Sequence, residues 1–352
     1  MATDTGRDYL LWRRLFGLPL VVTSTFALLT VLTAVVAGLP LRDPDGFLGP
    51  SYLRLPLIVV AMIALDLFPR VLRQRPAPRH LLPSVVKAWQ TRWTTSRLAV
   101  AAAGLASFYL AYVAYRNLKS YLPFLREQLL DPALMATDQW FAAGLYPADV
   151  LHHLLGTGLN AEILSVVYMA FLGLVPVSLT AALIWSDQLT RGAWYVTALC
   201  WNWILGTITY YAVPSLGPVY VRPSVFTDLP GTAVADLRDS LHANRLEALP
   251  DPHATEAMQG IAAFASLQVS IVFTAALITH RTGAPRLVRI AMWTYLLLTA
   301  VATVYFGWHY LIDVPAGLAV GAASVWLAIR ATRASTAPVT TAPGIAPTPL
   351  PT

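Results

Sequence analysis

The fold is decided by residues 288–330, which read VRIAMWTYLLLTAVATVYFGWHYLIDVPAGLAVGAASVWLAIR. Two apolar runs, 288–307 and 309–330, follow one another here, and each has about the 20 residues that a helix needs to cross a lipid bilayer. A helix satisfies all its backbone polar groups within one segment, which the water-free membrane interior requires. The stretch therefore predicts two membrane-spanning helices joined by a short polar connection around His309.

The same pattern recurs along the rest of the chain. With 57% hydrophobic and only 12% charged residues, the composition excludes an ordinary soluble domain, in which about a quarter of the residues are charged. We therefore predict an all-α fold, a polytopic membrane helical bundle of about eight transmembrane helices. The further apolar runs cover residues 15–38, 52–68, 98–115, 161–185, 192–213 and 258–279.

Basic residues cluster in the short connections between apolar runs, and this placement predicts the topology. Loops rich in Lys and Arg stay on the cytoplasmic side of a membrane. We therefore expect a multi-pass plasma-membrane protein with both termini in the cytoplasm. Its net charge of +6 then reflects topology, and nucleic acid is not an expected partner. The most basic connection contains Arg70, Arg73, Arg75, Arg79, Lys87, Arg92 and Arg97.

The chain divides into three regions. Residues 1–97 hold an N-terminal transmembrane pair and the basic cytoplasmic loop, and residues 98–332 form the membrane core. Residues 333–352 are rich in Pro, Thr and Ala, so we predict a disordered cytoplasmic tail. Three prolines interrupt residues 120–157, which predicts short helices along the outer membrane surface.

His309 and Asp313 are four residues apart at the junction of the last two runs. On a helix this spacing places both side chains on one face, one turn apart. A carboxylate there can accept the Nδ1 proton of the imidazole and leave Nε2 as a nucleophile or base. Ionisable groups near a membrane are costly unless used or paired, which favours a functional site on the outer face. The alternative is a structural bond that ties the helix ends.

Further polar residues of the outer face allow additional predictions. His152 and His153 either line a headgroup site or form a solvated surface, and Asp131 and Asp138 are expected to orient or cap short helices. The single cysteine, Cys200, leaves no disulfide and no thiolate cluster. No metal-ligand spacing is evident, so we expect neither a metal nor another cofactor.

The stretch YFGWHYLIDVPAG, residues 305–317, resembles the third signature of the type 2 phosphatidic-acid phosphatase superfamily. Its form is that of the aureobasidin-resistance, inositol-phosphorylceramide-synthase-like branch. Upstream, Lys119 and Arg126 match the first signature, a lysine followed after six residues by an arginine, although Glu127 replaces the customary proline. The resemblance, which covers about residues 100–330, implies a six-helix phosphatase-like core within the bundle.

The resemblance implies a role for each matching residue. His309 attacks phosphorus and forms a phosphohistidine, while Asp313 orients its ring. The implied substrate is a lipid phosphate, diphosphate or phosphodiester in the bilayer. A helix N-terminus and positive side chains attract its anionic oxygens. The residues implied to bind the phosphate are Lys119, Arg126, Ser266 and, as a further candidate, Arg116.

Two departures from the family pattern concern activity. Ala302 and Thr303 stand where the phosphatases carry a Ser-Arg pair, and the phosphotransferase branch also lacks that arginine. The second signature usually ends in a histidine, the general acid, where this chain has Gln268. A glutamine can donate a hydrogen bond to a leaving oxygen but cannot give up a proton. The loss of a general acid lowers the rate by about a hundredfold to ten-thousandfold.

Three explanations for Gln268 stay open: a natural member with degraded or altered activity, a deliberately inactivated variant, and an active enzyme whose donor needs no acid. His253 or Glu256 of the outer loop could also replace the acid. We predict an inositol-phosphotransferase-like or lipid phosphate phosphatase-like enzyme of the extracytoplasmic face. The alternative is a catalytically silent protein that binds lipid phosphates, or a transporter that uses the same cavity.

Overall fold

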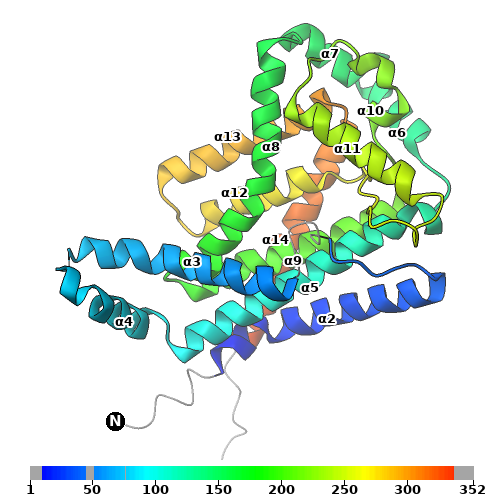
Figure 1. Cartoon of the computed structure of the whole chain (residues 1–352). Helices are drawn as coiled ribbons and strands as arrows, with labels where there is room; N and C mark the ends of the chain where they lie inside the picture. Colours follow the sequence, from blue (N-terminus) through cyan, green and yellow to red (C-terminus); the bar gives the residue numbers. More distant parts are fainter. Residues whose placement is uncertain (1–9, 45–50, 76, 337–352) are drawn as a thin grey trace, which may run out of the picture.

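The computed structural model describes residues 10–44, 51–75 and 77–336, and these residues form helices, turns and loops without a strand (Figure 1). The predicted all-α fold is confirmed. The helices that correspond to the apolar runs are α2 (Leu11–Ala37), α3 (Ser51–Arg73), α5 (Thr95–Leu125), α8 (Leu159–Thr180), α9 (Leu189–Ala212), α12 (Leu267–Arg281), α13 (Arg286–Tyr305) and α14 (Asp313–Thr336).

Five helical segments in the described part of the chain are long and apolar enough to cross a membrane. They are α2, α5, α8 with its π-helical continuation to Trp185, α13, and α14 as far as Thr332. The chain is thus a multi-pass membrane protein by the length and composition of its helices, while the number eight stays a prediction. Helix α12 is shorter than its predicted run because residues 258–266 form a loop.

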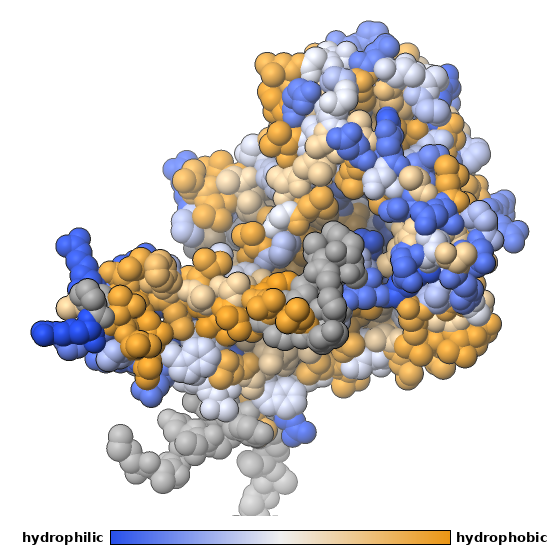
Figure 2. All heavy atoms as spheres, viewed as in Figure 1, coloured by the Kyte–Doolittle hydropathy of each residue, from blue (hydrophilic) through white to orange (hydrophobic). Residues whose placement is uncertain are grey.

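The outer surface of the bundle is apolar along several of these helices. On α2, the side chains of Leu28, Leu29, Val35 and Val36 are exposed. Figure 2 shows hydrophobic residues along α2 and α3, with hydrophilic residues gathered around α11. Water would penalise an apolar surface of this extent, whereas lipid tails would not.

Helix α9 lies inside the bundle and packs against α2, α5, α12 and α14. Its interior position explains why it carries polar side chains. Asn202 is fully buried, donates to the Ala198 carbonyl oxygen and to Thr274 Oγ1, and thereby satisfies its amide within the protein. Polar groups inside a membrane bundle are tolerated where neighbouring helices bond them.

Helices α12 and α14 pack backbone against backbone. A Cβ atom at Gly317 would lie 2.4 Å from the Ser266 carbonyl oxygen, and one at Gly321 would lie 2.7 Å from the Ser270 carbonyl oxygen. The four-residue spacing places both glycines on one face of α14, which is the small-residue pattern of close helix contacts in membranes. The two helix N-termini are therefore held at a short, fixed separation.

Short helices gather at one end of the bundle, away from α4 (Leu81–Arg92) and the basic loop (Figure 1). Pro123 lies in the last turn of α5, and the helix continues past it to Leu125. A proline cannot donate to the carbonyl four residues earlier, and here Gln259 Nε2 donates to that Lys119 oxygen instead, at 3.0 Å. The short helices are α6 (Asp131–Phe141), α7 (Pro147–Leu155), α10 (Pro218–Val221), η4 (Pro223–Phe226) and α11 (Ala233–Ala248).

At the other end, arginines bind the carbonyl groups where α8 and its continuation stop. Arg97 is buried and donates to the carbonyl oxygens of Ile184 and Ser186. Cations stabilise helix C-termini because the last carbonyl groups have no partner within the helix. Helix α14 continues to Thr336, four residues into the predicted tail, and residues 337–352 lie outside the described residues.

Candidate active site

His309 lies in the turn between α13 and α14, and Asp313 is the first residue of α14. The prediction that both residues share one helix is therefore wrong. Gly307 takes a positive φ of 67° and breaks the helix, and a Cβ atom there would collide with the Phe226 ring. The two side chains meet across a turn instead of along a helix face.

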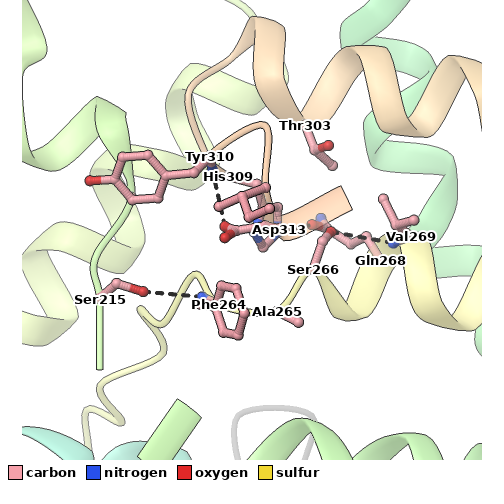
Figure 3. Close-up of polar contacts among 12 residues, drawn as sticks. Ser215, Phe264, Ala265, Ser266, Gln268, Val269, Thr303, His309, Tyr310 and Asp313 are labelled. Atoms are coloured by element: carbon pink, nitrogen blue, oxygen red, sulfur yellow. Dashed lines mark hydrogen bonds and ion pairs between the residues drawn. The ribbon is translucent and has the colours of Figure 1, made fainter. Parts of the chain in front are cut away.

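The contact predicted between the two side chains is present. His309 Nδ1 lies 3.1 Å from Asp313 Oδ2, which also accepts the backbone N–H of Tyr310 at 3.0 Å (Figure 3). Asp313 is completely buried and His309 is 5% exposed. A buried carboxylate that accepts two hydrogen bonds fixes both the tautomer and the orientation of the imidazole.

Gln268, in the first turn of α12, contacts the other ring nitrogen. Its Oε1 lies 3.0 Å from His309 Nε2. When Nδ1 carries the only proton, Nε2 is an acceptor, and the glutamine must turn its amide N–H toward it. When Oε1 faces Nε2, it is Nε2 that donates a proton to the glutamine. In either arrangement Nε2 is already hydrogen-bonded to Gln268.

Ser266 caps α12 and ties it to α14. Its Oγ accepts the backbone N–H of Val269 at 3.4 Å, and its own N–H donates to the Asp313 carbonyl oxygen at 3.2 Å (Figure 3). The preceding loop is fixed by Ser215, whose Oγ accepts the N–H of Phe264 at 3.1 Å. Ser266 thus positions the helix that carries Gln268.

Two aspartates of α6 hold the loops around His309. Asp131 accepts the N–H groups of Leu216 and Gly217 and, at 2.8 Å, the hydroxyl of Tyr310. Asp138 accepts the backbone N–H groups of Leu311 and Ile312, which follow in the same turn. Burial raises the pKa of Asp138 to about 6, although these hydrogen bonds oppose the shift. The two carboxylates hold the turn that carries His309 and the loop at residues 216 and 217, rather than only their own helix.

A cavity opens beside His309. Its walls come from α6, α7, α10, η4 and the turn that carries the histidine. One cation lines it, Arg222 at the end of α10, which no sequence signature predicted. The lining residues are Met135, Asp138, Tyr146, Pro147, Ala148, Pro218, Arg222, Val225, Phe226, Val304, His309 and Tyr310.

Comparison with protein families identifies the family to which the chain belongs. A family model described as the PAP2 superfamily matches residues 132–327, more than half of the 352 residues. The chain belongs to the PAP2 superfamily. No curated protein and no solved structure gives a significant match. The match includes Gln268, His309 and Asp313, and it begins after Lys119 and Arg126.

In this PAP2 superfamily member, the predicted phosphate-binding cations do not line the cavity beside His309. Lys119 Nζ lies 4.9 Å from the centre of the Tyr210 ring and 3.4 Å from the Tyr115 hydroxyl oxygen. Arg126 is exposed at the end of α5, and Arg116 is half-buried on the same helix. Their convergence on His309 stays a prediction.

The histidine pair of α7 is divided between two environments. His152 Nε2 lies 2.8 Å from the Tyr305 carbonyl oxygen, and its ring packs edge to face against Tyr305 and Phe226. His153 is exposed, with Nδ1 2.8 Å from the Asp149 carbonyl oxygen. His152 therefore supports the wall of the cavity. Within the described residues, no cluster of three His, Cys, Asp or Glu side chains could hold a metal ion.

Proposed function

We propose that this protein is a membrane-embedded phosphotransferase or phosphatase that acts on a lipid phosphate, diphosphate or phosphodiester. The observation that carries the proposal is the buried pair of His309 and Asp313, whose side chains meet at 3.1 Å beside a cavity. Membership of the PAP2 superfamily supports phosphate-ester chemistry. The apolar helices support a substrate that lies in the bilayer.

In the proposed reaction, His309 Nε2 attacks phosphorus and the bond from phosphorus to the leaving oxygen breaks. The phosphoryl group is then carried as a phosphohistidine, while Asp313 holds the Nδ1 proton and compensates the positive charge of the ring. Water or a lipid hydroxyl takes the phosphoryl group in the second step, which distinguishes hydrolysis from transfer. Nε2 becomes available only when Gln268 moves away from it.

The missing general acid restricts the leaving group. Gln268 cannot protonate a departing alkoxide, so a group that is already stable as an anion, such as the phosphate leaving a diphosphate, is favoured. We further propose that the site faces the extracytoplasmic side and that both termini are cytoplasmic. The support is the concentration of basic residues at the end of the bundle opposite the site.

One observation favours a second function. Gln268 occupies the nucleophilic nitrogen directly, so the same site could bind a lipid phosphate without turnover. The two functions are separated by measuring phosphate or headgroup release from a panel of lipid phosphates and diphosphates with purified protein and with His309→Ala. Turnover that depends on His309 supports the enzyme. Headgroup binding without any turnover supports the silent binding protein.

A further inference from the structure

The cation that shares a cavity with His309 is Arg222, which follows α10 in the outer loop. We propose that Arg222 binds the anionic oxygens of the phosphate group held at His309. This assignment rests on the proposed function, because it needs an anion at the histidine. It differs from the sequence prediction, which placed the phosphate-binding cations on α5 at Lys119 and Arg126.

Arg222 is exposed, and the contacts that orient its side chain involve a neutral group, Tyr146. Its guanidinium carbon lies 4.1 Å from the centre of the Tyr146 ring, and its N–H donates to the hydroxyl of the same tyrosine. In the described part of the chain, no carboxylate forms an ion pair with it. A ring face and a hydroxyl oxygen hold a guanidinium in place without neutralising it.

The backbone fixes α10 against the turn that carries the nucleophile. The N–H of Val219 donates to the Gly307 carbonyl oxygen at 2.9 Å. Gly217 takes a positive φ of 104°, and a Cβ atom there would lie 2.6 Å from the Trp308 carbonyl oxygen. Arg222 therefore follows directly on a segment that is hydrogen-bonded to the His309 turn.

The proposed chemistry calls for positive charge close to the phosphate group. Phosphoryl transfer develops charge on the equatorial oxygens, and a guanidinium meets two such oxygens with parallel hydrogen bonds. On α13, where the family phosphatases carry an arginine, this chain has Thr303, a buried residue whose hydroxyl donates to the Ala300 carbonyl oxygen. Arg222 supplies from the outer loop the charge that Thr303 lacks.

The test is the affinity of the purified full-length protein for two probes, inorganic phosphate and a short-chain phosphatidic acid, measured by titration calorimetry. Arg222→Gln is expected to weaken binding by about tenfold to a hundredfold, which is the range for a hydrogen bond to a charged group. Arg222→Lys keeps the positive charge but cannot form two parallel hydrogen bonds, so its affinity for the probes should fall several-fold. The matched control is Arg238→Gln, since Arg238 lies on α11, pairs with Asp239 and does not line the cavity beside His309.

A loss with either probe, and none for Arg238→Gln, supports the assignment and shows whether free phosphate or the lipid headgroup is bound. Binding by Arg222→Gln that equals the wild type overturns the assignment and leaves the proposed function standing. If the wild-type protein binds neither probe, both the assignment of Arg222 and the proposed function are rejected. If Arg222→Gln does not fold, Arg222→Lys decides, because wild-type affinity in that variant contradicts a bidentate contact.

Discussion

Replacing Gln268 by histidine tests the site most directly. The Gln268 side chain reaches to 3.0 Å from His309 Nε2, so an imidazole at this position would stand next to the atoms that exchange during phosphoryl transfer. A positioned general acid contributes about a hundredfold or more, which corresponds to about 2.7 kcal/mol of transition-state stabilisation. We therefore expect Gln268→His to raise turnover of alkoxide-leaving lipid phosphates by about a hundredfold.

The gain should depend on the leaving group and on pH. A diphosphate leaves as a stable anion, so its turnover should rise much less than that of a lipid phosphate ester. The acid works only while it is protonated, so the gain should decline as the pH rises above about 6.5, the ordinary pKa of histidine. Release of phosphate from both substrates across a pH series measures these effects.

A second variant separates acid catalysis from removal of the Nε2 contact. Gln268→Ala frees the nitrogen of His309 without adding an acid, so it should raise diphosphate and ester turnover by the same factor. His309→Ala in the Gln268→His background should abolish all gains, because no phosphohistidine can form. A folded Gln268→His protein that binds headgroups yet turns over neither substrate would refute the enzyme mechanism.

Three further predictions concern the fold and its orientation. Cysteines placed at Ala233 and Ala77, in a chain whose native cysteine is replaced, should be labelled from the outside and the inside respectively; labelling of both from one side contradicts the topology. Gly317→Ala should lower the free energy of unfolding by about 1–3 kcal/mol, because the new methyl group meets the Ser266 carbonyl oxygen. Thermal unfolding measures this, and Gly173→Ala, with no atom within 4 Å of the new Cβ, is the control that should not lose stability. Because the pKa of Asp138 is raised to about 6 from about 3.9 in the unfolded chain, the folded state holds the proton longer, and stability should fall as the pH rises through this window. Asp138→Asn should remove that slope from the thermal midpoints.

The membrane helices could be predicted from the sequence because their signal is local. An apolar run of sufficient length indicates a span whatever surrounds it, and α2 and α13 follow their runs closely. Helix α12 does not, since residues 258–266 are apolar yet bond to other loops, as Phe264 bonds to Ser215. Composition alone does not distinguish an apolar loop that packs against other loops from the first turns of a helix.

Some contacts around His309 have a local signal in the sequence, and others do not. The pairing with Asp313 follows from a four-residue spacing, although Gly307 places it on a turn rather than a helix. The roles of Asp131 and Arg222 carry no local signal, because their partners lie far along the chain. The sequence separation between Asp131 and Tyr310 is 179 residues, and only the folded arrangement brings the two groups together.

The glycine contact between α12 and α14 determines which parts of the molecule can change in evolution or design. Gln268 and Asp313 stand in the first turns of these two helices, and the Cβ positions of Gly317 and Gly321 would each meet a carbonyl oxygen at or in α12. Substitution there is expected to disturb the packing of the two helices and the position of Asp313 together. Helix α11 contributes no residue to the cavity beside His309, so substitutions on it should disturb the site less than substitutions on α10, α12 or α14. New headgroup preferences should therefore arise around α11, and a library directed at that helix would leave the contacts of His309 in place.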